Sequence, residues 1–125
     1  MSKILIIEDD NDIALLLGKR LIKSKFEVMI ASDAYLGTKN ARETKPDLII
    51  LDLMMPAGGG MTVLKNLKLS INTKLIPVIV FTGMRNDDIK AKVLDMGVDA
   101  YIEKPYDFES LLNLIDKLIF HSDDK

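Results

Sequence analysis

Short apolar runs rich in Ile, Val and Leu alternate along this chain with segments whose apolar residues recur at helical spacing. Short continuous apolar runs bounded by turn residues are typical of strands that are covered on both faces. We therefore expect strands near residues 3–7, 26–30, 47–51, 76–81 and 99–103, with a helix after each. Such alternation predicts a parallel sheet with helices on both sides.

Side chains that can cap a helix N-terminus precede most of the expected helices. They are Asp10 or Asp12, Ser32 or Asp33, Asn86 to Asp88, and Asp107. The second helix, ending near residue 45, is the least regular, because Gly37, Thr38 and Asn40 are poor helix formers. The segment 56–60 contains three glycines and predicts a flexible loop before the third helix.

Five strand–helix units favour a flavodoxin-like, doubly wound α/β fold with strand order 2-1-3-4-5. The chain of 125 residues is long enough for one domain with a sizeable core. We expect that domain to cover residues 1–121, followed by a polar C-terminal tail at 122–125. His121 borders this tail and is expected to be solvated.

Composition narrows the classes of function. The chain has no cysteine, which excludes disulfides and thiolate chemistry. A net charge of -2 provides no general attraction to nucleic acid, and no apolar run is long enough for a signal peptide or a membrane span. We expect a cytoplasmic protein whose own contacts involve neither nucleic acid nor membrane.

Polar residues stand where the expected strands end. They are Glu8, Asp9 and Asp10 after the first strand, Asp52 after the third, Thr82 after the fourth and Lys104 after the fifth. The carboxyl ends of parallel strands meet at one edge of the sheet, so these groups are expected to lie together. Crowded carboxylates repel one another, and Mg²⁺ relieves this repulsion. A lysine and a hydroxyl beside the cation can hold a phosphoryl group, for which Asp52 is the candidate nucleophile.

Simpler interpretations exist for each residue. The acids after the first strand can serve the helix dipole, Thr82 can belong to a turn, Lys104 can be a surface residue and Tyr101 can be core packing. A flavodoxin also shares the architecture, but acids stand where its phosphate loop needs hydroxyls. A phosphatase of the aspartyl-nucleophile type commonly needs a second acid at position 54, which is Met54 here.

Four short motifs occur together at the strand ends. They are Ile6-Ile7-Glu8-Asp9-Asp10, Leu51-Asp52-Leu53-Met54-Met55-Pro56, Thr82-Gly83 and Lys104-Pro105. In this order they resemble the receiver domain of response regulators in two-component signalling, and the resemblance covers essentially the whole chain. It implies that the chain is a phosphoacceptor signalling domain rather than an enzyme, although it assists its own phosphorylation and dephosphorylation.

The resemblance implies a role for each site residue. Asp52 is the phosphoacceptor and also a Mg²⁺ ligand, Asp9 is a direct Mg²⁺ ligand and Glu8 is a ligand through water. The Met54 backbone carbonyl completes the protein's coordination of the ion. Thr82 and Lys104 bind phosphoryl oxygens, with Thr82 and Tyr101 as switch residues and a cis peptide bond before Pro105. Met54 and Met84 flank the site with apolar side chains, so hydrolysis of the phosphoryl group is expected not to be unusually fast.

The resemblance also implies partners. The phosphoryl donor is a sensor histidine kinase or a phosphotransfer protein. The output is a downstream effector protein or an output domain outside this sequence, and phosphorylation-dependent homodimerisation is a further expectation. The alternative is a pseudo-receiver, an interaction module that acts without phosphorylation.

Overall fold

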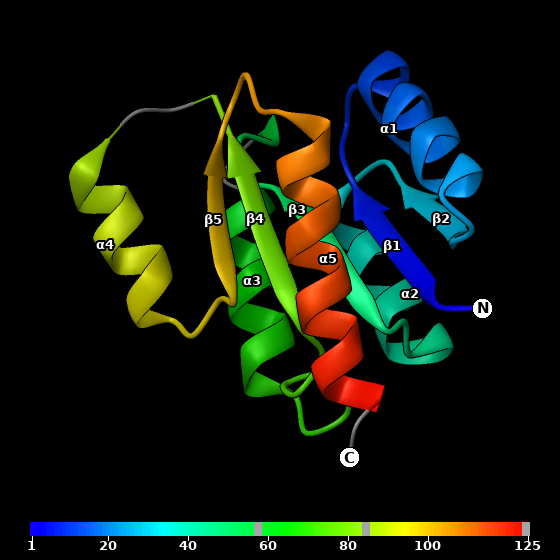
Figure 1. Cartoon of the computed structure of the whole chain (residues 1–125). Helices are drawn as coiled ribbons and strands as arrows, with labels where there is room; N and C mark the ends of the chain where they lie inside the picture. Colours follow the sequence, from blue (N-terminus) through cyan, green and yellow to red (C-terminus); the bar gives the residue numbers. More distant parts are fainter. Residues whose placement is uncertain (57–58, 84–85, 124–125) are drawn as a thin grey trace.

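The computed structural model of the chain describes residues 1–56, 59–83 and 86–123, with side chains described up to residue 119. Five parallel strands form one sheet in the order β2-β1-β3-β4-β5, which confirms the expected topology (Figure 1). The strands are β1 (Lys3–Ile7), β2 (Glu27–Ala31), β3 (Leu48–Asp52), β4 (Val78–Thr82) and β5 (Ala100–Glu103).

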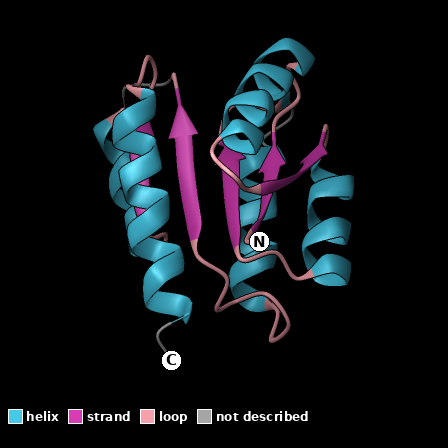
Figure 2. Cartoon of the chain, turned by 45° about the vertical axis from the view of Figure 1, so that its right-hand side comes forward, coloured by secondary structure: helices cyan, strands magenta, loops and turns pink. Residues whose placement is uncertain are grey.

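Helices cover both faces of the sheet (Figure 2). They are α1 (Asn11–Lys23), α2 (Ala34–Thr44), α3 (Gly59–Leu69), α4 (Asp87–Asp95) and α5 (Phe108–Asp123). In Figure 1, α1 and α5 lie on the near side of the sheet, and α2 and α3 lie behind it. The chain is therefore the doubly wound fold that the strand–helix alternation predicts.

Alternating strand residues face two separate hydrophobic cores. Leu5, Ile49 and Val80 belong to the core beneath α2, α3 and α4. Their neighbours Ile6 and Ile50 belong to the core beneath α1 and α5. Every residue of β3 and β4 is buried, because these strands are central and covered on both sides.

Capping residues fix where the helices begin, as the sequence predicts. The Asp10 side chain accepts hydrogen bonds from the backbone of Asp12 and Ile13 at 3.0 and 3.1 Å. Asp33 accepts from Leu36 N at 2.8 Å. Asn86 caps α4, and Asp107 accepts a hydrogen bond from the Ser110 backbone N–H. Each of these side chains caps the N-terminus of the helix that follows it.

The start of α3 differs from the expectation of a loop through residue 60. The helix begins at Gly59, so the predicted loop is wrong for Gly59 and Gly60, and residues 57–58 lie outside the described chain. A Cβ on Gly60 would come within 2.6 Å of Leu53 Cα and 2.7 Å of the Asp52 carbonyl oxygen. The glycine is needed for close packing of the helix against the end of β3, rather than for flexibility.

A second glycine explains the irregular composition of α2. A Cβ on Gly37 would lie 2.8 Å from Cγ2 of Ile7, so only glycine lets α2 approach β1 this closely. The helix forms despite its poor formers because its buried side packs on the sheet.

The peptide bond before Pro105 and the end of α5 complete the comparison with the sequence. The peptide bond between Lys104 and Pro105 is cis, as expected. Helix α5 continues to Asp123, so residues 122 and 123 are helical where a polar tail was expected.

Among the described residues, no helix is long and apolar enough to cross a membrane.

Candidate functional site

Three carboxylates meet at the carboxyl end of the sheet. Glu8 follows β1, Asp9 is its neighbour, and Asp52 is the last residue of β3, the strand beside β1. One oxygen from each lies within 4.8 Å of the other two. The strand order therefore joins acids that are 44 positions apart in the sequence, as predicted.

The three acids differ in how far they are buried. Asp52 and Glu8 are only 4% and 1% exposed, whereas Asp9 is open to solvent. Asp52 Oδ1 accepts a hydrogen bond of 3.0 Å from the Met54 backbone N–H, which fixes one of its two oxygens. The site thus has a buried, oriented carboxylate beside an accessible one.

Lys104 brings a positive charge to the same point. Its Nζ lies 3.3 Å from Glu8 Oε1 and 3.8 Å from Asp52 Oδ2. The ammonium also lies 4.5 Å from the centre of the Phe81 ring, a cation–π contact that helps to hold it in place. Sequence reasoning places Lys104 here but misses both the Glu8 pair and Phe81, whose roles depend on the register between β4 and β5.

The pKa of Glu8 shows how crowded the acids are. Burial, the hydrogen bond with Asp52 and the negative charge of Asp52 raise this pKa from 4.5 to about 7. The Asp10 backbone N–H at 3.2 Å and Lys104 lower it, but by less. One lysine does not balance three carboxylates, so the site retains an excess of negative charge that a cation can neutralise.

The donor set fits a hard divalent cation. All the candidate ligand atoms are oxygens, and one carboxylate is exposed enough to leave room for water ligands. Mg²⁺ prefers this combination of one or two carboxylates with waters and phosphate oxygens.

The two predicted switch residues lie on adjacent strands. Thr82 is fully buried at the end of β4, and its carbonyl accepts from Lys104 N–H at 2.8 Å. Tyr101 is half-buried on β5, opposite Val80, and the Lys90 ammonium lies 5.7 Å from the centre of its ring. Met54 is half-exposed beside Asp52, and Met84 lies outside the described residues.

Comparisons with known proteins identify the family of the chain. The family model of the response regulator receiver domain matches residues 4–116. The chain is 37% identical over 123 residues to the DNA-binding dual master transcriptional regulator RpaA of Synechocystis, covering 98% of this chain and 51% of RpaA. It is also 37% identical over 106 residues to the transcriptional regulatory protein PhoP of Bacillus subtilis, covering 84% of this chain and 43% of PhoP.

The fold has equally clear counterparts. A CheY-like response regulator receiver domain from Methanospirillum hungatei superposes with a TM-score of 0.90 at 28% identity, over 99% of this chain and 98% of the other. The chain belongs to the response regulator receiver family, whose members are domains of two-component response regulators. It spans about half the length of the curated relatives that it matches.

Proposed function

We propose that Asp52 accepts a phosphoryl group from a phosphohistidine of a sensor kinase or phosphotransfer protein. The observation that carries this proposal is the position of Asp52: buried at the end of the central strand, beside two further acids and 3.8 Å from the Lys104 ammonium. Burying a carboxylate costs free energy, and buried ionisable groups beside other charges are concentrated at functional sites.

In the transfer, the Asp52 oxygen that does not accept from the Met54 N–H attacks phosphorus while the phosphorus–nitrogen bond to the donor histidine breaks. The products are an acyl phosphate on Asp52 and a neutral imidazole, because the donor's other ring nitrogen already carries a proton when the phosphorus–nitrogen bond breaks. Lys104 neutralises one equatorial oxygen of the transferring group, and the Thr82 hydroxyl donates to another. A bound Mg²⁺, held by Asp9, Asp52, the Met54 carbonyl and Glu8 through water, would supply positive charge to the remaining oxygens.

The expected consequence of phosphorylation is a change in the shape of the surface formed by α4, β5 and α5. The phosphoryl group adds about -1.5 to -2 charges, which draws the Thr82 hydroxyl towards it. The space that Thr82 leaves beneath β4 is then available to Tyr101, whose ring is only half-buried on the neighbouring strand. Phosphorylation in this way favours one of two packings of α4, β5 and α5.

Relatives support the wider context. A receiver domain of RstA from Klebsiella pneumoniae, 27% identical with a TM-score of 0.85, is described as BeF3-activated, and BeF3 imitates a phosphoryl group on a carboxylate. RpaA and PhoP are named as transcriptional regulators. We therefore propose a cytoplasmic role in which this domain controls an effector protein or an output domain. The alternative of a pseudo-receiver has no observation in its favour.

The test is intact-mass measurement after incubation with Mg²⁺ and a small-molecule phosphodonor. The wild type is expected to gain one phosphoryl group, and neither the Asp52→Asn variant nor EDTA-treated protein is expected to gain any. Asp12→Asn, which changes an exposed acid near the site, is the matched control and is expected to react like the wild type. An equal adduct on Asp52→Asn would refute the assignment of the nucleophile.

A further inference from the structure

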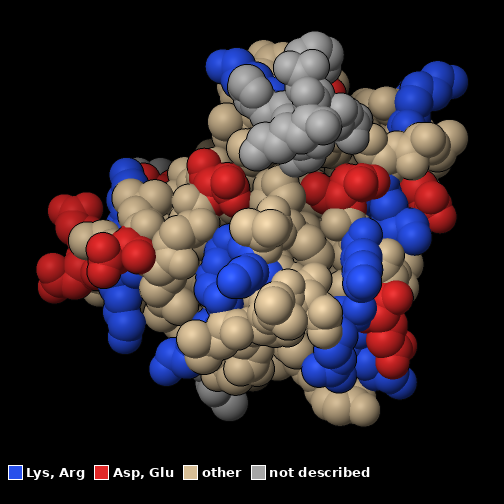
Figure 3. Space-filling view, turned by 90° about the horizontal axis from the view of Figure 1, so that it is seen from below, with Lys and Arg blue, Asp and Glu red and all other residues tan. Residues whose placement is uncertain are grey.

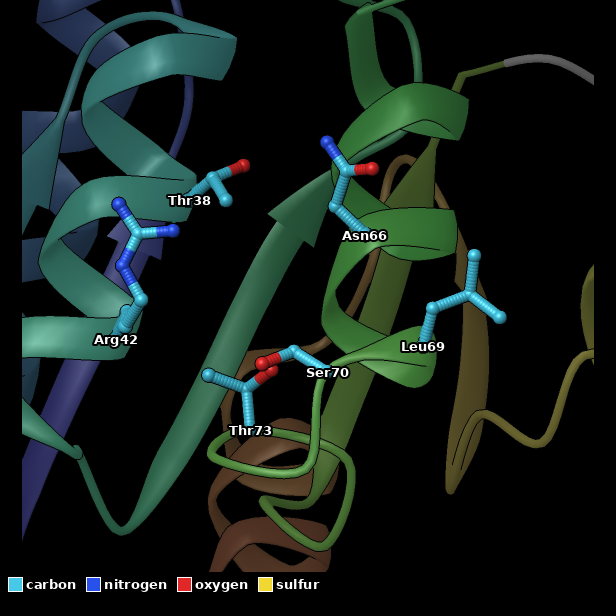
Figure 4. A pocket seen from close by; sticks show the side chains of 6 residues that line it. All are labelled: Thr38, Arg42, Asn66, Leu69, Ser70 and Thr73. Carbon is cyan, nitrogen blue, oxygen red and sulfur yellow. The ribbon is translucent and has the colours of Figure 1, made fainter.

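A polar groove lies between α2 and α3, away from the acidic site. It has a volume of about 310 Å³ and is lined by Thr38, Arg42, Asn66, Leu69, Ser70 and Thr73. Figure 4 shows Thr38 and Asn66 facing each other from the two helices, with Ser70 and Thr73 at the lower end. No carboxylate is among the lining residues, so no negatively charged side chain lines the groove.

Several hydrogen-bond donors in the groove are uncommitted. The side chains of Arg42, Asn66 and Thr38 make no hydrogen bond or ion pair to any described residue. Ser70 Oγ only accepts a bond, 3.3 Å from the Asn72 backbone N–H, so its own proton is free to be donated. A guanidinium with amide and hydroxyl donors is the combination that recognises phosphate oxygens in proteins.

Two carbonyls in the last turn of α3 already have hydrogen-bond partners. Carbonyl groups at a helix C-terminus carry partial negative charge, and the groove reaches the last turn of α3. The Leu67 carbonyl accepts the Thr73 hydroxyl at 2.8 Å, and the Asn66 carbonyl accepts Ser70 N–H at 3.2 Å. These two carbonyls near the groove therefore already accept hydrogen bonds.

The surrounding charge also favours an anion. Residues 34–45 and 59–77, which include both helices and the loop after α3, contain six Lys and Arg residues but one acid, Glu43, although the whole chain carries -2. Figure 3 views the lower end of the molecule, where Lys and Arg side chains lie in the middle and, with Asp and Glu side chains beside them, towards the lower right of the face. This local excess of positive charge raises the concentration of anions near the groove.

We infer that this groove is a second, non-covalent site for a soluble phosphate monoester, with Arg42 binding the phosphoryl oxygens and Thr38, Asn66 and Ser70 completing the shell. The volume is at the lower end of the range for ligand pockets, about 300 Å³, which suits a small ligand. The site is independent of Asp52, because it lies beside the last turns of α2 and α3 rather than at the carboxyl ends of the strands.

Amide NMR titration with phenyl phosphate, in EDTA without Mg²⁺, tests this inference. Saturable shifts are expected at Thr38, Asn66 and Ser70, and phenol, which lacks the phosphoryl group, is expected to cause none. Because Arg42 provides the only charge lining the groove, Arg42→Gln is expected to weaken binding about tenfold or more. Arg42→Lys is expected to bind with intermediate affinity, since it keeps the charge without the fork of donors.

Lys39→Gln is the matched control, because Lys39 lies on the same helix outside the groove lining. It is expected to bind phenyl phosphate almost as the wild type does. Three results would overturn the inference: shifts that do not saturate, shifts that phenol reproduces, or equal weakening by Lys39→Gln and Arg42→Gln. Unchanged amide spectra of the free variants would show that each still folds.

Discussion

Replacing Glu8 by Gln is expected to change how the stability of the metal-free protein depends on pH. Burial and the neighbouring Asp52 carboxylate raise the pKa of Glu8 from 4.5 to about 7. The folded protein therefore holds this proton more tightly than the unfolded chain does. The associated stability is fully present below about pH 4.5 and is lost as the pH rises through about 7.

The size of the effect follows from the two pKa values. With 4.5 unfolded and about 7 folded, the wild type is expected to lose about 2–3 kcal/mol of unfolding free energy between roughly pH 5 and pH 8. Gln cannot titrate, so Glu8→Gln is expected to lack this loss. The variant gives up the 3.3 Å charge pair with Lys104 but leaves that lysine its contact with Asp52 at 3.8 Å.

Urea unfolding in EDTA at several pH values measures the difference. The curves of wild type and Glu8→Gln are expected to converge near the acid end and separate progressively towards pH 8. Asp12→Asn, an exposed acid on α1, serves as control and is expected to follow the wild type. A wild-type-to-Glu8→Gln difference that stays constant with pH would refute the reasoning about the crowded carboxylates. Excess Mg²⁺ is expected to restore stability to the wild type at pH 8, because it binds only the folded protein.

Three further predictions concern other parts of the molecule. Lys104→Met is expected to slow formation of the phosphoryl adduct on the order of 100-fold in timed mass measurements, because it removes a positioned charge. Gly37→Ala is expected to cost about 1–3 kcal/mol in urea unfolding, because its Cβ would meet Ile7 at 2.8 Å; Gly18→Ala, with its nearest atom at 3.5 Å, is the control and is expected to stabilise α1 by up to about 1 kcal/mol. Asp33→Ala is expected to cost about 1 kcal/mol by loss of the α2 cap, and a cost below the error of the unfolding curves would contradict that role.

Much of the fold follows from local patterns that the sequence displays. The apolar runs identify all five strands to within about two residues, because burial on both faces demands uninterrupted apolar residues. Caps at Asp10 and Asp33 were equally predictable. The start of α3 was not, since the need for Gly60 arises from contact with the backbone of Leu53, a tertiary effect that no local pattern reports.

The acidic site, too, could be predicted only in part from the sequence. Convergence of Glu8, Asp9 and Asp52 was predictable, because strand order alone places them at one edge. The cation–π contact of Lys104 with Phe81 was not, because it depends on how far the ends of β4 and β5 are offset. The groove at Arg42 also escaped prediction, since its residues are ordinary surface types until two helices bring them together.

The central claim is that Asp52 carries the phosphoryl group, and chemical trapping tests it most directly. Borohydride reduces an acyl phosphate to an alcohol, so phosphorylated aspartate becomes homoserine, which peptide mass spectrometry can locate. After treatment with phosphodonor and Mg²⁺, homoserine is expected at position 52 alone and is expected to disappear when Mg²⁺ is withheld. Homoserine at position 9 or 10 instead, or none from protein whose fold is intact, would contradict the account.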